Sequence, residues 1–436
     1  MPVPLMRRFD VTDENFAPAF ALFLQERRET PVEVDNTVRQ IIAEVRADGL
    51  AALLRLAKQF DGVELNATTL AVSTEEIEVG AAACPPEVRD AIALAAERIA
   101  AYHARQRPAD AWFKDDLGTE LGWRWTALDA VGIYVPGGRA AYPSTVLMNA
   151  VPAKVAGVGR IAMVTPPGRL QPAVLAAAKA AGVTEIWRVG GAQAVAALAY
   201  GAGPIMPVDK IVGPGNAYVT AAKRQVYGQV GIDALAGPSE IVVVADRAND
   251  PDWIAADLLS QAEHDPAAQS ILITDDAAFA DRVEAAIQDQ LIGLSTATDA
   301  RQSLKDHGAI ILAPLDQAPS LVNDIAPEHV EFAVDNPEDW AREVRHAGAI
   351  FLGRLTPEAI GDYVAGSNHV LPTSRAARFS SGLSLFDFIK RTSLVKCDAE
   401  SFAALGPPTV VLADAEGLPA HARSAAIRLG QSLKST

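Results

Sequence analysis

From Val131 onward, short runs rich in β-branched residues alternate with alanine-rich stretches of helical spacing, and this alternation limits the fold more than any other feature. Strands that alternate with helices build parallel sheets, and several of these runs are apolar on both faces, as strands covered by helices on both sides are. Nine strands are many for one sheet, so we predict two α/β units of similar size that divide near Pro238. The predicted strands are residues 131–135, 160–164, 185–189, 209–212, 240–245, 269–274, 308–313, 330–334 and 349–352.

The segments on either side of this region have a different character. Before it, apolar residues at helical spacing predict a helix over 36–60 and a second helix that ends at about Arg107. After Gly353 the alternation stops, and a polar loop and an irregular stretch precede a helical tail that begins at about Asp398. We predict a helical N-terminal region (1–127), two α/β domains (128–237 and 238–378) and a C-terminal tail (379–436).

Composition narrows the classes of function. The 436 residues carry a formal net charge of -16, and an acidic surface repels phosphate backbones, so we expect no nucleic-acid partner. We find no apolar stretch that predicts a signal peptide or a membrane span. The two cysteines, Cys84 and Cys397, lie far apart and argue against a disulfide scaffold or a cysteine zinc site. The simplest interpretation is a soluble cytoplasmic protein.

Three glycine-rich turns, at 135–138, 189–193 and 212–216, follow predicted strands, where α/β proteins bind phosphate groups. None is a full G-x-G-x-x-G sequence, and the last comes closest, with Tyr218 in the third glycine position. One such turn alone is commonly no more than a tight connection between a strand and a helix. Three in one domain favour a nucleotide cofactor that is bound by a non-standard pattern.

A predicted amphipathic helix over 251–265 carries Gln261 and His264 one turn apart at its C-terminal end. This spacing lets an amide oxygen and an imidazole reach a single metal ion. Glu263 and Asp265 flank the pair and could orient the histidine ring. The alternative is a histidine that interacts only with the helix dipole.

Further ionisable residues lie on predicted loops. Glu328 and His329 precede a strand, and an adjacent carboxylate and imidazole can activate water and accept a proton, although a solvated loop would look the same. Asp362 and His369 lie in the polar loop after the last strand, and His421 lies in the tail. We interpret the remaining histidines as surface residues: His103, His307 and His346.

Together these pieces resemble the histidinol dehydrogenase family from Val38 to Gly430, and each turn and ionisable cluster lies inside a matching motif. The length and the order of the motifs exclude chance agreement. They are GIYVPGG (132–138), PSTVLMNAVPAKVAG (143–157), VGGAQAVAALAYG (189–201), DKIVGPGNAYVTAAKRQV (209–226), AGPSEIVVVAD (236–246), DLLSQAEHD (257–265), APEHVE (326–331), GDYVAGSNHVLPT (361–373), SGLSLFDFIKRTS (381–393) and AEGLPAH (415–421).

The resemblance implies two incomplete Rossmann-like domains, the first for the cofactor and the second for zinc and catalysis, and a homodimer that exchanges its helical tails. It implies NAD-dependent oxidation of L-histidinol to L-histidine through L-histidinal, in histidine biosynthesis, with one zinc ion per subunit. Zinc would position the substrate, and His421 and Glu416 would come from the other subunit. The implied residues are the zinc ligands Gln261, His264, Asp362 and His421, the NAD contacts Tyr134, Gln193 and Asn216, and the substrate contacts Ser239, His329 and Glu416 beside the zinc ligands.

A mechanism follows from this assignment. His329 would accept the alcohol proton, and Glu328 would activate water so that the aldehyde reacts as its hydrate. A thiol route is disfavoured, because Cys84 precedes two prolines and Cys397 lies in an unmatched segment of the tail.

Three alternatives remain open on the residues alone. A related enzyme could oxidise a sulfonated diol, although the carboxylate of Glu416 would repel a sulfonate. A zinc hydrolase could use Glu328 on water and would produce no reduced nicotinamide. A metal-binding scaffold protein would show no substrate-dependent change at all.

Overall fold

The computed structural model describes residues 5–25, 32–137, 142–168 and 170–430. Every one of the nine predicted strands is present, and each end lies within one residue of its predicted position. The strands are β4 (Ala130–Tyr134), β5 (Arg160–Thr165), β6 (Glu185–Arg188), β7 (Lys210–Val212), β9 (Glu240–Ala245), β10 (Gln269–Thr274), β11 (Ala309–Leu312), β12 (His329–Ala333) and β13 (Ala349–Leu352). They form two parallel sheets, which confirms the predicted α/β fold.

The first sheet has the strand order β6-β5-β4-β7-β8, and all of its neighbours are parallel. Its last strand, β8 (Gly231–Ile232), has only two residues and leaves no periodic pattern in the sequence. Buried residues of α2 (Val32–Asp48), α8 (Gly191–Tyr200) and α9 (Ala217–Val226) share one core with the sheet. On the opposite face lie α5 (Pro86–Ala104), α6 (Pro143–Ala156) and α7 (Pro172–Ala181), which pack on one another.

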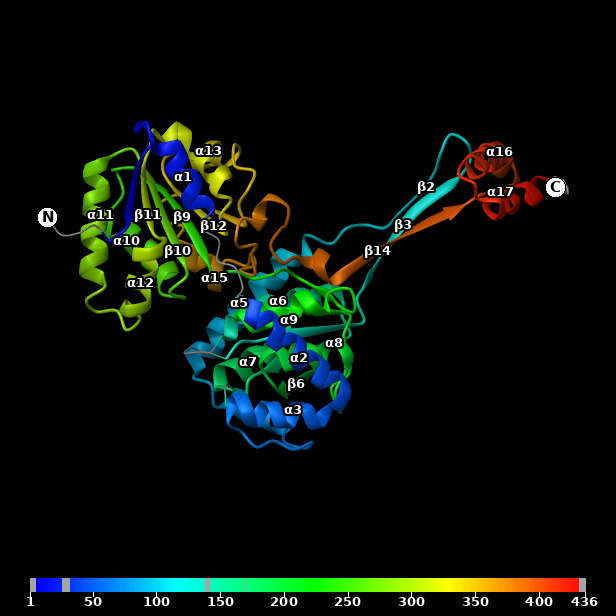
Figure 1. Cartoon of the computed structure of the whole chain (residues 1–436), viewed down its shortest axis with the longest axis horizontal. Coiled ribbons are helices and arrows are strands. Elements are labelled where there is room, and N and C mark those ends of the chain that lie inside the picture. Colours follow the sequence, from blue (N-terminus) through cyan, green and yellow to red (C-terminus); the bar gives the residue numbers. More distant parts are fainter. Residues whose placement is uncertain (1–4, 26–31, 138–141, 169, 431–436) are drawn as a thin grey trace. The chain divides into compact units, whose positions relative to one another are not determined.

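The second sheet has the order β1-β11-β10-β9-β12-β13 and is also parallel (Figure 1). One face packs on α10 (Pro251–Ala262), α11 (Ala277–Gln290) and α12 (Ala297–His307). The other face packs on α1 (Phe16–Gln25) and α13 (Ala318–Ile325). The division between the two sheets falls between β8 and β9, as predicted near Pro238.

The first part of the N-terminal region, before α5, differs from the helical prediction in two ways. Its first described strand, β1 (Arg7–Asp10), pairs with β11 at an edge of the second sheet. The predicted helix over 36–60 is broken at Gly49 (φ 53°) and continues as α3 (Leu50–Leu56) and a π-helical turn, Ala57–Asp61. The four residues of β1 do not alternate between polar and apolar side chains as a strand does. Pairing with a distant strand is therefore what stabilises β1. A short helix, α4 (Thr74–Ala82), follows.

A second compact unit consists of residues 107–127 and 389–436. In it β2 (Ala111–Lys114), β3 (Glu120–Ala127) and β14 (Ile389–Lys396) form an antiparallel sheet, and α16 (Ala399–Ala415) and α17 (Pro419–Ala426) follow. The helical prediction missed β2 and β3, and β14 lies in the stretch predicted to be irregular. Most side chains of β14 are exposed, so its sequence lacks the apolar alternation that marks a strand. The predicted domain boundaries remain predictions.

None of the described helices is both long enough and apolar enough to cross a lipid bilayer.

Candidate functional site

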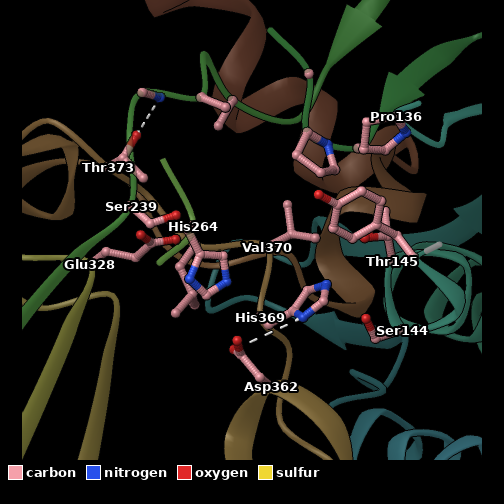
Figure 2. A pocket seen from close by; sticks show the side chains of 18 of the residues that line it. Pro136, Ser144, Thr145, Ser239, His264, Glu328, Asp362, His369, Val370 and Thr373 are labelled. Carbon is pink, nitrogen blue, oxygen red and sulfur yellow. Dashed lines mark hydrogen bonds and ion pairs between the residues drawn. The ribbon is translucent and has the colours of Figure 1, made fainter. Parts of the chain in front are cut away.

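A cavity of about 410 Å³ collects most of the predicted site residues (Figure 2). On the side of the first sheet it is lined by the turns that follow β4 and β7, at the carboxyl ends of these strands. On the side of the second sheet it is lined by residues at the amino ends of β9 and β12. The predicted residues that line it are Asn216, Ser239, Gln261, His264, Glu328, His329 and Asp362.

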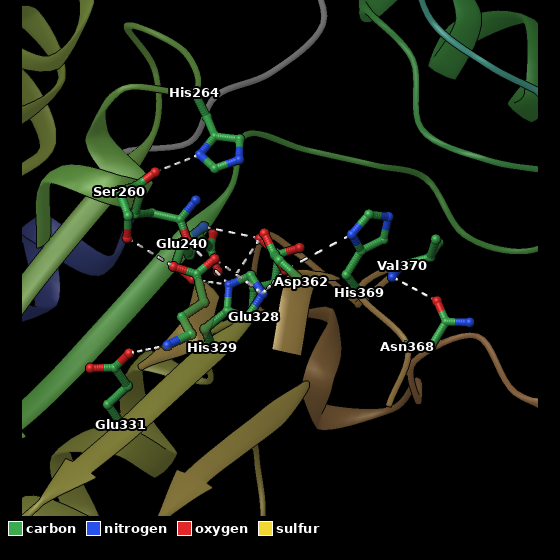
Figure 3. A network of polar contacts seen from close by, with 12 residues as sticks. Glu240, Ser260, His264, Glu328, His329, Glu331, Asp362, Asn368, His369 and Val370 are labelled. Atoms are coloured by element: carbon green, nitrogen blue, oxygen red, sulfur yellow. Dashed lines mark hydrogen bonds and ion pairs between the residues drawn. The ribbon is translucent and has the colours of Figure 1, made fainter. Parts of the chain in front are cut away.

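Glu328 and His329 are both buried, and His329 is the first residue of β12, so the alternative of a solvated loop is wrong. The Oε2 atom of Glu328 accepts the backbone N–H of Glu240 at 3.0 Å. The Nδ1 atom of His329 lies 3.0 Å from the carbonyl oxygen of Glu240, which can only accept, so Nδ1 carries the ring proton. The Nε2 atom is therefore left with a lone pair, and it has no hydrogen-bond partner among the described residues; Figure 3 shows the network of polar contacts around His329.

Burial sets the charges of this pair. Because burial disfavours the imidazolium, the pKa of His329 is lowered from its ordinary value, and the neutral ring that can accept a proton is favoured. Burial, and then the nearby carboxylate of Glu240, raise the pKa of Glu328 well above its ordinary value. A carboxylate with a raised pKa is a stronger base toward water than an exposed one.

His329, Glu358 and Asp362 offer ligand atoms that all lie within 4.8 Å of one another. The Nε2 atom of His329 is 3.7 Å from Oε1 of Glu358 and 3.9 Å from Oδ1 of Asp362. Glu358 and Asp362 lie one turn apart in α15 (Glu358–Tyr363) and therefore on one face of it. The sequence prediction missed Glu358, although its i, i+4 spacing to Asp362 could have suggested it.

The acidic groups of the cavity fit a divalent cation. Burial raises the pKa of Asp362 and raises that of Glu358 to about 7. The ion pairs found for Glu328, Glu358 and Asp362 among the described residues are with histidines, His329 and His369. Buried carboxylates of this kind are normally paired or bound to a metal. Gln261 and His264 line the same cavity and add oxygen and nitrogen atoms that can bind a metal. The Nε2 atom of Gln261 is buried and has no hydrogen-bond partner among the described residues.

The local structure around His264 differs from the prediction. Helix α10 ends at Ala262, because Pro266 disfavours helical backbone in the residue before it, and His264 follows the helix. Neither flanking carboxylate orients the ring, since Glu263 accepts the hydroxyl of Thr296 and Asp265 accepts a backbone N–H. Instead Nδ1 lies 2.8 Å from the carbonyl oxygen of Ser260, which leaves Nε2 available as a ligand atom.

Glu416 and His421 belong to the second compact unit, where Glu416 caps α16 and His421 lies in α17. Both are exposed. Their assignment to the site remains a prediction.

A second cavity, of about 590 Å³, is lined by all three predicted cofactor contacts, Tyr134, Gln193 and Asn216. It shares Gly137 and Asn216 with the first cavity. The N-terminus of α8 opens on it; the N-cap residue Gly190 has no side chain to cap the helix, and the N–H of Gly191 donates to the hydroxyl of Tyr134 at 2.9 Å. Uncapped backbone N–H groups at a helix N-terminus are suited to a phosphate group.

Comparison with known proteins decides the family. The histidinol dehydrogenase family profile matches residues 24–429. A histidinol dehydrogenase of Caulobacter vibrioides is 73% identical, over 97% of this chain and 99% of its own length. That of Rhodospirillum rubrum is 62% identical over 97% and 99%. The chain belongs to the histidinol dehydrogenase family. A crystal structure of histidinol dehydrogenase from Elizabethkingia anophelis, 35% identical, has a TM-score of 0.93 and covers 99% of both chains. Family membership confirms the resemblance seen in the sequence and makes the chain an NAD-dependent oxidoreductase.

A buried ion pair between Lys223 and Asp233 fixes the third glycine turn, and no sequence argument pointed to it. Lys223 Nζ donates to the carbonyl oxygen of Gly213 at 3.0 Å, and Asp233 accepts the N–H of Gly213 at 2.8 Å. Gly213 has φ 110°, and a Cβ atom there would lie 2.3 Å from the carbonyl oxygen of Tyr134. The turn therefore needs glycine, and the ion pair holds both of its backbone groups.

His103 was interpreted as a surface residue, and this is wrong. It is fully buried in α5, where Nδ1 donates to the carbonyl oxygen of Ile99 at 2.8 Å. Its flanking Arg105 and the other charges near the helix end mark the exposed face, and the ring points to the opposite one.

Proposed function

We propose that this chain oxidises L-histidinol through L-histidinal to L-histidine, as the last steps of histidine biosynthesis, with two molecules of NAD per substrate. The observation that carries the proposal is the buried Nε2 atom of His329, a free base beside the buried carboxylate of Glu328. The cavity that contains them adjoins the one lined by Tyr134 and Gln193. Proton acceptance and cofactor binding thus lie side by side.

We assign a zinc ion to Gln261, His264 and Asp362, with His421 of the partner subunit as the fourth ligand. The first three line one cavity and offer the nitrogen and oxygen donors that zinc prefers. Zinc, when bound, would hold the imidazole and amino nitrogens of histidinol. Glu358 lies close enough to Asp362 to compete for the same ion.

The chain's own groups move the protons. His329 Nε2 takes the hydroxyl proton of the alcohol as the substrate carbon loses a hydride. Glu328 then takes a proton from the water that adds to the aldehyde, and the protonated His329 returns its proton to the carbonyl oxygen. In the second oxidation His329 takes the hydroxyl proton of this hydrate. NAD, when bound, supplies the hydride acceptor. Ser239 lines the cavity as a substrate contact.

The two cysteines support the hydrate route. Cys84 is buried and Cys397 belongs to the second compact unit, and neither is among the residues that line the two cavities. An aldehyde held in the first cavity would therefore meet Glu328 and water, not a thiol.

We also propose a homodimer in which Glu416 and His421 complete the site of the partner subunit. The second compact unit exposes many large apolar side chains, which single soluble domains seldom do. These are Trp112, Phe113, Val395, Val411, Leu412 and Ile427. Coexpression of His329→Asn chains with His421→Ala chains tests the exchange. About half of the dimers should be mixed, and one of the two sites of each mixed dimer is intact, so the mixture should regain up to about a quarter of the wild-type activity. If each tail served its own chain, the mixture would stay inactive.

The function itself is tested with purified, zinc-loaded protein, L-histidinol and NAD. We expect two reduced nicotinamides per histidinol, no reaction after treatment with EDTA, and recovery when zinc returns. A zinc-loaded dimer that reduces no NAD with histidinol would overturn the proposal.

A further inference from the structure

The second cavity has a wall that the sequence analysis did not assign to any function. It comes from the N-terminal region, from Ile41 of α2 and from Phe60 and Asp61 of the π-helical turn Ala57–Asp61. π-helical turns are rare and are often found at functional sites. This turn ends at Gly62 in a left-handed conformation (φ 68°), and its last two residues line the cavity.

The two residues of this turn that line the cavity, Phe60 and Asp61, have no evident structural role. The Oδ2 atom of Asp61 is buried and has no hydrogen-bond partner among the described residues. Buried carboxylate oxygens are normally satisfied, so an unpartnered one that lines a cavity suggests a ligand donor. Phe60 is 52% exposed although it is aromatic and lies on the same wall.

The position of this wall selects the part of the cofactor that it meets. The nicotinamide must reach the first cavity, and Gly137 and Asn216 are the residues that the two cavities share. Asp61 and Phe60 line only the second cavity. The adenosine end of NAD is the part that remains for them. Phe60, Ile41 and Pro166 offer an apolar surface for a flat base, and a carboxylate accepts hydrogen bonds from a ribose diol.

We propose that Asp61 accepts a hydrogen bond from the 2′-hydroxyl of the adenosine ribose of NAD and thereby excludes NADP, while Phe60 packs on the adenine. The proposal rests on the proposed use of NAD. In NADP the 2′-hydroxyl is replaced by a phosphate, which would place a second negative group beside a half-buried carboxylate. An acidic residue on this hydroxyl distinguishes NAD from NADP in other dinucleotide-binding proteins, but from a different position in the fold.

The experiment measures binding by calorimetry to the full-length, zinc-loaded protein without histidinol. The ligands are NAD, its 2′-deoxyadenosine analogue and NADP. Wild type should bind the deoxy analogue about tenfold more weakly than NAD, which is the usual loss for a hydrogen bond to a charged group. Asp61→Asn should bind NAD about tenfold more weakly than wild type does, and its affinity for the deoxy analogue should be close to that of wild type. The ratio of the affinities for NAD and NADP should fall at least tenfold.

Glu64→Gln is the matched control. It removes the same charge three residues away, from an exposed side chain that pairs with Lys58 and does not line the cavity. It should leave all three affinities unchanged.

Equal binding of NAD and the deoxy analogue by wild type would overturn the inference without any variant. An unchanged preference against NADP in Asp61→Asn would do the same. If wild type neither binds NAD nor reduces it with histidinol, the proposed function fails first, and the inference fails with it.

Discussion

The two parallel sheets have the same architecture but turn opposite ends toward the chemistry. The first sheet presents the carboxyl ends of its strands, where Tyr134 ends β4 and glycine turns follow β6 and β7. The second sheet presents the amino ends of β9 and β12, where Glu240 and His329 are the first residues. The usual rule places ligands at the carboxyl ends of parallel strands. It therefore finds the cavity that we propose for the cofactor and would miss the residues that we propose as bases.

The two ends also differ in electrostatics. The turns of the first sheet hold backbone N–H groups and neutral side chains such as Gln193 and Asn216, and their buried charges are paired, as in Lys223 and Asp233. The end of the second sheet gathers carboxylates and imidazoles whose pKa values burial shifts toward the neutral forms. Our proposal thus assigns cofactor binding to the first sheet and proton transfer to the second. The following predictions test this division.

The largest effect is expected for His329→Asn. Loss of the Nε2 base should lower kcat by about 10³-fold for both histidinol and histidinal, since general-base catalysis typically contributes 10²–10⁴-fold. The affinity for NAD should stay unchanged, because His329 does not line the second cavity. Steady-state rates and calorimetry measure the two quantities. A large loss of NAD affinity would show that the two ends are not independent.

The next effect is expected for Glu328→Gln. The amide keeps the acceptor for the N–H of Glu240 but cannot take a proton from water. Oxidation of histidinal should therefore slow about 10²-fold, and oxidation of histidinol should slow much less. Rapid-mixing measurements of a single turnover from each substrate compare the steps. Equal losses in both would contradict the separate roles of Glu328 and His329.

Lys223→Met tests the first sheet. It leaves Asp233 buried without its partner, which should lower the free energy of unfolding by about 3–5 kcal/mol. Urea denaturation measures this loss. The double variant Lys223→Met with Asp233→Leu is the control and should be closer to wild type, because neither charge is then left unpaired. If the single variant is as stable as wild type, the ion pair does not hold the Gly213 turn.

The smallest effect is expected at His103, which lies in neither cavity. Burial lowers its pKa in the folded chain, so the unfolded chain binds a proton more readily as the pH falls through about 6.5. This group should therefore destabilise the fold below that pH, by about 1 kcal/mol or less. His103→Asn should remove this part of the pH dependence between pH 7.5 and 5.5, as measured by urea denaturation. If the stability of His103→Asn depends on pH as that of wild type does, the loss of stability at low pH comes from other groups, including those at the second sheet.

Much of the fold and part of the site could be predicted from local sequence. The nine strands were found because runs such as 240–245 are continuously apolar and end at turn residues, and local chemistry is enough to mark them. The glycine turns were also found from local chemistry. A backbone angle such as the φ of 110° at Gly213 favours glycine wherever it occurs. Glu328 and His329 were found as an adjacent pair, but their burial was not visible.

Other features depend on contacts between distant residues. Strands β1 and β14 have no apolar alternation of their own, and their partners lie hundreds of residues away, so pairing alone makes them strands. The burial of Asp61 and Glu358 beside cavities follows from how helices pack, and a carboxylate in sequence looks the same whether it is solvated or buried. The sequence by itself determined the class of fold and the glycine turns, and it singled out the residues that we propose as bases, because these depend on local periodicity and residue chemistry. Only the tertiary structure decided which ends of the sheets meet and which charges lose water, because both depend on long-range packing.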